Sequence, residues 1–246
     1  MTTQSENWQT ATASAQHRSC VTPKALSRAV EDYLKAIYLL EQQSDVVHTN
    51  ALCAQLGDLR PGSVTGMLRR LAVQELVVHT PYRGVQLTPD GERAALALLR
   101  THRLLETYLV KALGYTWDEV HAEAERLEHH ISPQLAARIA AHLGDPSTDP
   151  HGDPIPRLDG SLPTCAAWKL SDVPAQIPVQ IARVTTQDAE RLRYLATIGL
   201  VPGAELTVVT AAPFQGPLEL AIAGQTQMLD YRLAQVIMVT TPGNEP

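Results

Sequence analysis

The stretch HAEAERLEHHIS, residues 121–132, is rich in the side chains that bind metal ions in proteins. Residues three and four positions apart are neighbours on a helix, so His121, Glu125, Glu128 and His129 would share one face. Imidazole and carboxylate groups arranged in this way can bind a divalent cation if other helices supply further ligands. The alternative is a solvated face of charged residues, which is the more common role of a single acidic helix.

Two earlier segments carry residues that could complete such a site. The segment THRLLETYL places His102 and Glu106 four positions apart, on one face of a long predicted helix. Asp32 lies beside the apolar stripe of the first predicted helix, where a buried carboxylate is costly without a partner. Taken singly, Asp32 reads as an exposed acid and His102 as a packed histidine at a dimer face. Three helices that all carry oxygen and nitrogen ligands together favour a metal site.

Motifs of metal-dependent and nucleophilic enzymes are missing from the sequence. It contains no H-E-x-x-H of zinc peptidases, no paired Glu-x-x-His of di-iron bundles, and neither G-x-S-x-G nor a P-loop. We therefore expect no enzyme and no small-molecule substrate, with a metalloenzyme kept as the less favoured alternative.

The bulk properties limit the location and the class of protein. The chain has 246 residues, a net charge of −6 and an apolar fraction of 44%, and no apolar run approaches the roughly 18 residues of a membrane span. The three cysteines are scattered, which does not suggest a disulfide framework, and the first twenty residues do not resemble a secretory signal. These features predict a cytoplasmic protein with no membrane partner. The negative charge argues against nucleic acid as a partner, although a local positive patch can outweigh it.

The order of the predicted elements indicates a DNA-binding fold. Apolar spacing predicts helices in SRAVEDYLKAIYLLEQ, HTNALCAQLGDL and RPGSVTGMLRRLAVQELV, and LVVHTPYRGVQL predicts a hairpin. Helix, helix, helix and hairpin is the order of a winged helix-turn-helix. A long helix that ends at Gly114 follows, then helices up to residue 142 whose wide apolar stripes favour a homodimer face over a larger internal core.

The last hundred residues have a different texture. Residues 144–163 are rich in proline, glycine and aspartate and read as a linker. After Ile177, short strand-like runs surround one helix, which predicts a small β-barrel. The predicted fold class is mainly α with a small β part.

These segments resemble the diphtheria toxin repressor family of metal-dependent transcriptional regulators, with its manganese-sensing branch. The resemblance runs from about Ser27 to the C-terminus and depends on the segments EDYLKAIYLL, PGSVTGMLRRLAVQELV, YRGVQLTPDGE, THRLLETYL, HAEAERLEHHIS and GDPIP in this order. It implies a flexible tail over 1–23, a winged helix-turn-helix over 24–95, a helical dimerisation and metal-binding domain over 96–145, a linker over 146–176 and an SH3-like domain of the FeoA type over 177–242.

The resemblance also implies a set of metal ligands. The main regulatory site would use Asp32, Glu125, Glu128 and His129, and a neighbouring site would use His102, Glu106 and His121. Hard carboxylates at positions 32 and 125, where iron-type members place methionine and cysteine, favour Mn²⁺, with Fe²⁺ as the alternative. Where the manganese branch has a second carboxylate on the first helix, this chain has Lys35.

The DNA-binding residues follow from the same resemblance. The recognition helix would span residues 61–71 and reach DNA through Arg60, Pro61, Ser63, Thr65, Arg69 and Arg70, and the wing tip through Tyr82 and Arg83. Ser63 and Thr65 are equally ordinary helix-capping residues. A homodimer would read a palindromic operator on double-stranded DNA and repress metal-uptake genes. A bound metal ion would tie the first helix to the dimerisation domain and favour the DNA-binding state.

Overall fold

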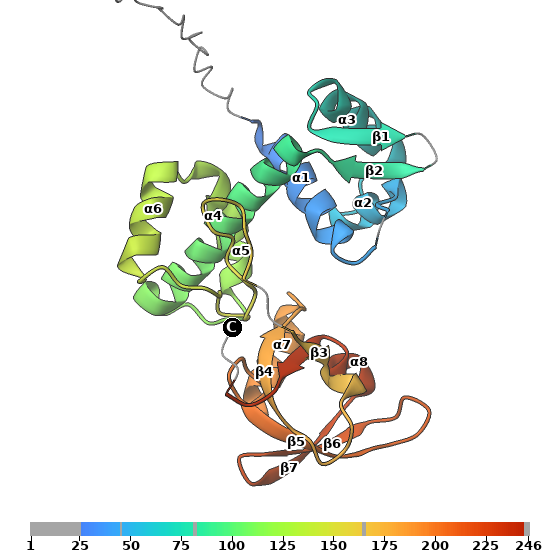
Figure 1. Ribbon diagram of the computed structural model, residues 1–246, viewed down its shortest axis with the longest axis vertical. Coiled ribbons are helices and arrows are strands. Elements are labelled where there is room, and N and C mark those ends of the chain that lie inside the picture. The colour runs from blue at the N-terminus through green and yellow to red at the C-terminus, as the bar shows by residue number, and fades with distance from the viewer. Residues whose placement is uncertain (1–25, 45, 81–82, 164–165, 244–246) are drawn as a thin grey trace, which may run out of the picture.

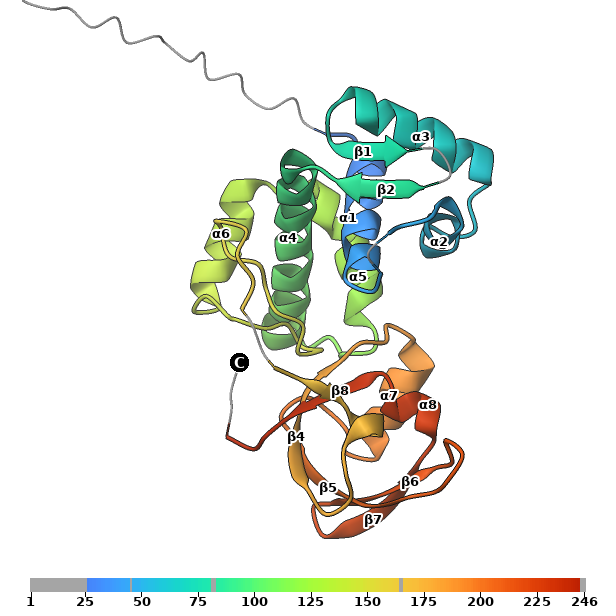
Figure 2. The ribbon, with the colours of Figure 1, turned by 45° about the vertical axis from the view of Figure 1, so that its right-hand side comes forward.

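A computed structural model of the chain describes residues 26–44, 46–80, 83–163 and 166–243. The chain forms three successive parts, which Figures 1 and 2 show from two sides. The predicted tail and the wing residue Tyr82 lie outside the described residues. No helix of the described part is long and apolar enough to cross a membrane.

The first part is a winged helix-turn-helix, as the sequence predicted. Its elements are α1 (Arg28–Glu41), α2 (Thr49–Gln55), α3 (Pro61–Val73), β1 (Val77–Thr80) and β2 (Gly84–Leu87). The two strands pair antiparallel, with Val77 opposite Leu87. Fully buried side chains from the three helices, Leu34, Leu52 and Leu68, form one core with the wing. This core fixes the position of α3, the predicted recognition helix.

Helix α4 (Pro89–Leu113) connects the first part to the second. It begins at Thr88, whose hydroxyl accepts a hydrogen bond from the Gly91 amide, and ends at Gly114, which has a φ of +74° and therefore closes the helix in the left-handed conformation that glycine favours. Its first half packs in the core of the winged helix and its second half in the core of the helical domain. One rigid helix thus belongs to both parts.

The helical domain is completed by two further helices and a packed loop. The helices are α5 (Val120–Leu127), which continues into the 3₁₀ turn η1 (Glu128–His130), and α6 (Pro133–His142). The proline-rich segment after α6 lies against α4 and buries Ile155. Arg100 donates a hydrogen bond of 2.7 Å to the Pro156 carbonyl, and Arg103 donates one to the Pro154 carbonyl. These arginines bind carbonyl groups that a proline-rich loop cannot pair within its own backbone.

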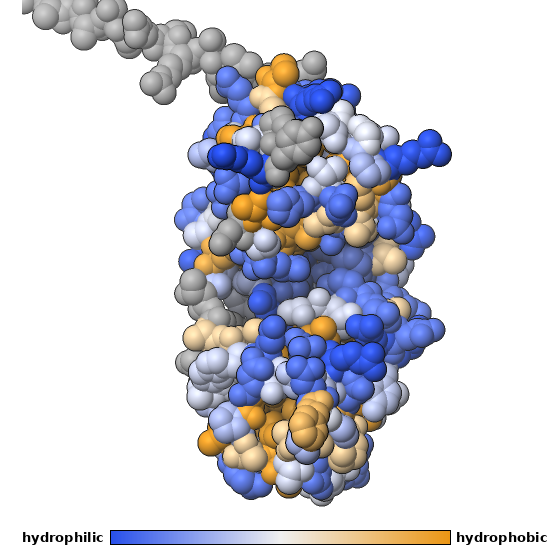
Figure 3. All heavy atoms as spheres, turned by 90° about the vertical axis from the view of Figure 1, so that its right-hand side faces the viewer, coloured by the Kyte–Doolittle hydropathy of each residue, from blue (hydrophilic) through white to orange (hydrophobic). Residues whose placement is uncertain are grey.

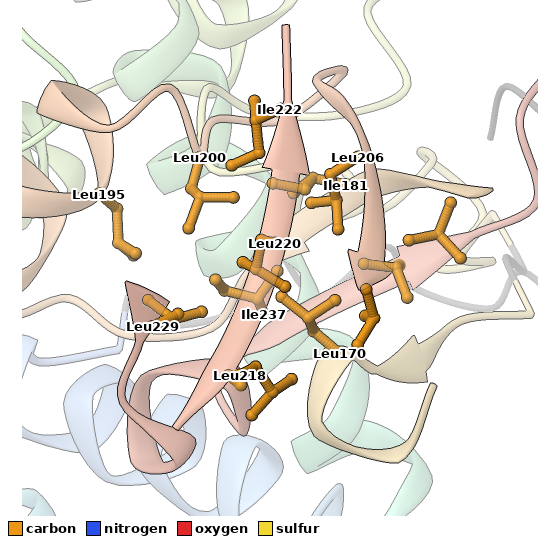
Figure 4. Packing of buried hydrophobic residues seen from close by; sticks show 14 of the residues in the cluster. Leu170, Ile181, Leu195, Leu200, Leu206, Leu218, Leu220, Ile222, Leu229 and Ile237 are labelled. Carbon is orange, nitrogen blue, oxygen red and sulfur yellow. The ribbon is translucent and has the colours of Figure 1, made fainter. Parts of the chain in front are cut away.

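The third part is a six-stranded antiparallel sheet with the order β3-β8-β4-β5-β6-β7. Its elements are β3 (Trp168–Lys169), η2 (Leu170–Asp172), β4 (Pro178–Val184), α7 (Ala189–Thr197), β5 (Glu205–Ala211), β6 (Leu218–Ile222), β7 (Gln225–Leu229), α8 (Tyr231–Ala234) and β8 (Ile237–Thr240). Alternating apolar residues of the strands meet side chains of α7 in a separate core (Figure 4).

The sheet of the third part does not close into the predicted barrel. A barrel requires pairing between its first and last strands, but β3 pairs with β8 and β7 pairs with β6, and the described strands β3 and β7 do not pair with each other. Strand β3 has only two residues, which is too short to complete a closed ladder. The described sheet is therefore open.

The third part is attached to the loop of the helical domain. The Val184 amide on β4 donates a hydrogen bond of 2.9 Å to the His151 carbonyl, and Arg193 on α7 forms an ion pair with Asp118.

Figure 3 shows one face of the molecule, which is coloured mainly as hydrophilic and has a hollow at mid-height.

Candidate metal centre

The seven predicted metal ligands meet where α1, α4, α5 and η1 pack against one another. Helix α1 contributes Asp32, and α4 contributes His102 and Glu106. The remaining ligands, His121, Glu125, Glu128 and His129, come from α5 and η1. The structure divides these side chains among several small groups whose ligand atoms lie within 4.8 Å of one another.

The first group joins the DNA-binding part to the helical domain. It consists of Asp32, Glu128 and His129, with 2.8 Å between His129 Nε2 and Asp32 Oδ1 and 3.5 Å between His129 Nε2 and Glu128 Oε1. The buried Nε2 atom makes no hydrogen bond of acceptable geometry with the described residues, although the Asp32 oxygen is close. A buried nitrogen that faces two carboxylates without a hydrogen bond fits a metal ligand.

Glu31 orients the histidine of this group. Its Oε2 atom lies 2.7 Å from His129 Nδ1, on the side of the ring that faces away from Asp32. A carboxylate that binds the second nitrogen of a metal-ligating histidine fixes the tautomer and strengthens the ligand. Glu31 was not among the residues predicted from the sequence, although a carboxylate next to Asp32 was the available signal.

The second group lies between α4 and α5. It consists of His102, Glu106 and His121. The Oε1 atom of Glu106 lies 3.0 Å from His102 Nε2 and 3.0 Å from His121 Nδ1, and the two imidazole nitrogens are 3.1 Å apart. These are the three residues of the neighbouring site that the family resemblance implied.

Glu125 lies with His102 and Glu128 in a third group rather than with Asp32. The Lys35 ammonium lies among these three side chains, 2.8 Å from Glu125 Oε1 and 2.8 Å from Glu128 Oε2. Helix α1 therefore reaches the helical domain through Asp32 and Lys35, one turn apart, and also through Glu31, which contacts His129.

A fourth group was not predicted from the sequence. It consists of Glu106, Asp149 and His151, and the last two belong to the segment that reads as a linker. His151 is fully buried, its Nε2 atom lies 2.7 Å from the Trp117 carbonyl, and its Nδ1 atom lies 3.7 Å from Glu106 Oε2 without a hydrogen bond to the described residues. The alternating Asp149-Pro-His151 pattern was the available signal, but only the fold of the loop brings it to Glu106.

Two buried groups of the cluster, His102 and Asp149, have raised pKa values and hold their protons tightly. Burial lowers the pKa of a histidine, but hydrogen bonds to Glu106 and Glu128 outweigh this and raise the pKa of His102 to about 9. Burial and the charges of Asp153 and Glu106 raise the pKa of Asp149 to about 8. Burial opposes ionisation of Glu106, but hydrogen bonds from His102 and His121, together with the nearby His151 imidazole, hold its pKa well below the usual range. A divalent cation would displace such protons, so metal affinity should rise with pH.

The donor set decides which ions fit. All four groups of the described residues consist of carboxylate oxygens and imidazole nitrogens, without a cysteine sulfur. Oxygen-rich sites with some imidazole suit Mn²⁺ and Fe²⁺, whereas soft thiolate ligands favour Cu⁺, Zn²⁺ or iron–sulfur clusters. The residues therefore fit a hard divalent cation.

Most of the predicted DNA-binding residues are exposed on the winged helix. Arg60, Pro61, Ser63, Arg69 and Arg70 are exposed on or beside α3, and Arg83 is exposed at the wing. Thr65 is half-buried, and its hydroxyl donates a hydrogen bond of 2.9 Å to the Pro61 carbonyl. This bond satisfies the hydroxyl within the helix, so Thr65 is less available to DNA than its neighbours.

Comparison with known proteins divides the chain into three matched regions. Residues 25–85 match the N-terminal DNA binding domain of the iron dependent repressors, residues 88–157 match their metal binding and dimerisation domain, and residues 168–241 match the FeoA domain. The iron-dependent repressor IdeR of Mycobacterium leprae is 32% identical over 85% of this chain and 95% of its own length. The diphtheria toxin repressor of Corynebacterium diphtheriae is 30% identical over 88% of this chain and 98% of its own length.

Solved structures lead to the same class of protein. A manganese-dependent transcriptional repressor in complex with manganese is 44% identical, with a TM-score of 0.81, and the match covers 86% of this chain and 99% of that one. A winged helix-turn-helix whose first helix shares a ligand cluster with a dimerisation domain defines a metal-dependent DNA-binding regulator. The chain belongs to the iron-dependent repressor family, which confirms the resemblance found in the sequence.

Proposed function

We propose that this protein is a homodimeric repressor that binds a palindromic operator when Mn²⁺ occupies the group formed by Asp32, Glu128 and His129. The observation that carries the proposal is the buried Nε2 atom of His129, which faces both carboxylates without a hydrogen bond to the described residues. Mn²⁺ is preferred because the donors are hard and because the manganese-dependent repressor is 44% identical. Fe²⁺ is the second candidate, since several relatives are iron-dependent repressors.

The position of the ligands explains how an ion would control DNA binding. Asp32 is on α1 of the DNA-binding part, whereas Glu128 and His129 are on η1 of the helical domain. Two carboxylates that face each other repel, and a divalent cation between them would replace this repulsion by attraction. The chain's own residues would then hold α1, and with it the α3 helix, at a fixed position relative to the dimerisation domain. An ion that binds this state more tightly shifts the population towards it.

The dimer would present two recognition helices to DNA. Leu113 at the end of α4 and Leu135 on α6 are large apolar residues that remain exposed, with 59% and 44% of their surface accessible. Burial of such residues against a second copy would stabilise a dimer. Two α3 helices related by a two-fold axis read half-sites about one helical turn apart. The third part, with its open sheet, would be the SH3-like domain that the sequence predicted.

DNA binding under controlled metal conditions tests the proposal. Fluorescence anisotropy with the protein's own promoter fragment would be measured at fixed salt, with chelator and then with Mn²⁺, anaerobic Fe²⁺ or Zn²⁺. We expect tight binding only with Mn²⁺ or Fe²⁺. Asp32→Ala and Glu128→Ala should remove the metal response and leave a folded dimer, whereas Glu123→Ala, on the same helical segment but outside the four groups, should keep it. Equal binding in chelator would contradict the proposal.

A further inference from the structure

The Lys35 side chain is buried in the middle of the ligand cluster. The residue is only 7% exposed, and its ammonium lies 2.8 Å from Glu125 Oε1 and 3.0 and 2.8 Å from the two oxygens of Glu128. An ammonium has three protons to donate, and the carboxylates of Glu125 and Glu128 both accept from it. The His102 Nδ1 atom, 3.2 Å away, completes the surroundings of the ammonium.

The ammonium occupies a position that has the features of a metal site. The ligand atoms of His102, Glu125 and Glu128 lie within 4.8 Å of one another, as do those of the other three groups. In the third group the Lys35 ammonium contacts all three ligands, whereas Arg28 and Arg103 each approach only one carboxylate of the first and the fourth group, at 3.9 and 3.7 Å. The Glu128 side chain is fully buried, so its charge requires a nearby cation.

We propose that Lys35 is a built-in cation that takes the place of one metal ion, so that this protein binds ions on either side of the Lys35 ammonium but none between His102, Glu125 and Glu128. The proposal rests on the proposed function in that it assigns ions to the neighbouring groups. A divalent cation at the third group would lie against the ammonium, and two like charges at that distance repel strongly in a buried site. Lys35 therefore determines how many ions the chain binds.

Lys35 has a second consequence for the coupling of the two parts. Asp32 and Lys35 are one turn apart on α1, and both face residues of α5 and η1. Asp32 needs an ion to be attracted to Glu128, whereas Lys35 attracts Glu125 and Glu128 directly. The Lys35 link between α1 and the helical domain is thus independent of metal, as is the contact between Glu31 and His129. The external ion would control only the link through Asp32.

Counting bound ions tests the proposal on the full chain. The metal-free wild-type protein, Lys35→Glu and Lys35→Arg would be dialysed against excess Mn²⁺, and manganese per chain would be measured by mass spectrometry. We expect Lys35→Glu to bind one ion more per chain than the wild type, because it replaces the ammonium by a ligand. Lys35→Arg keeps the charge and should bind the same number as the wild type. Lys111→Met, at an exposed lysine of α4, is the control and should also match the wild type.

A second measurement uses the wild type alone and does not depend on the folding of a variant. Crystals with Mn²⁺ would be measured near the manganese absorption edge, where anomalous density locates each ion. Density beside Asp32, and none between Glu125 and Glu128, would support the proposal. Density between Glu125 and Glu128, with Lys35 displaced, would overturn it, as would equal manganese counts in the wild type and Lys35→Glu. A wild-type protein that binds Mn²⁺ but binds DNA equally in chelator would refute the proposed function and leave the ion count valid.

Discussion

The contact between the third part and the helical domain depends on Gly152, which provides a sharp test of the structure. Gly152 has a φ of +85°, and a Cβ at this position would lie 2.0 Å from the Ala182 carbonyl oxygen and 2.7 Å from the Arg183 Cα. Both of these atoms belong to the backbone of β4, so no side chain can move aside. Gly152→Ala must therefore push β4 away from the loop that carries Asp149 and His151.

The contacts near Gly152 set the size of the effect. The backbone bond from Val184 to His151, 2.9 Å long, contributes about 1 kcal/mol. The ion pair between Arg183 and Asp153 is 3.2 Å long, and its arginine is partly exposed. It therefore contributes about 0.5 kcal/mol to the stability. The left-handed conformation adds roughly 1–2 kcal/mol for alanine. We expect Gly152→Ala to lower the free energy of unfolding by about 3 kcal/mol.

Gly203→Ala separates the steric effect from the backbone effect. Gly203 has a φ of +87°, and a Cβ added there would meet no described atom within 4 Å, so only the conformational cost of roughly 1–2 kcal/mol applies. Urea unfolding of both full-length variants, followed by circular dichroism, measures the difference. Equal stability of the two variants would refute the close packing of the loop on β4.

Three further predictions concern DNA, metal and pH. Arg83→Ala at the wing should weaken operator binding, because one phosphate contact is lost. The plot of log K against log salt should become shallower by about 1, as measured by anisotropy at several salt concentrations. Glu31→Gln should raise the dissociation constant for Mn²⁺ by about 10- to 100-fold in calorimetry, because the carboxylate orients His129; an unchanged constant would contradict this role. The folded pKa of His102, about 9, lies above its ordinary value of 6.5, so its stabilising contribution of about 3 kcal/mol is present below pH 6.5 and is lost as the pH rises to about 9. The pKa of Asp149 is also raised on folding, to about 8, so this group too stabilises the folded state less as the pH rises. Urea unfolding of the metal-free protein should therefore show a free energy of unfolding that falls between about pH 6.5 and 9. A flat or rising profile would refute these two pKa shifts.

Local patterns in the sequence were sufficient for the elements and for their order. The spacing of apolar residues predicted the three helices and the hairpin of the winged helix, and Gly114 was the predicted end of α4. These features depend on residues close together in the chain, whose preferences act whatever the rest of the fold does. The prediction of a β-barrel was wrong, because closure of a sheet into a barrel depends on pairing between strands far apart in the sequence.

The sequence by itself determined which residue types could bind a metal ion and that three helices would carry them, because ligand chemistry and helical spacing are local properties. Only the tertiary structure decided how these ligands are divided: Glu125 lies with Lys35, apart from Asp32, and the loop brings Asp149 and His151 to Glu106. The physical reason is that charges separated by many residues are brought within a few ångströms of one another only by packing, and at such distances the position of a single ammonium decides where an ion can bind.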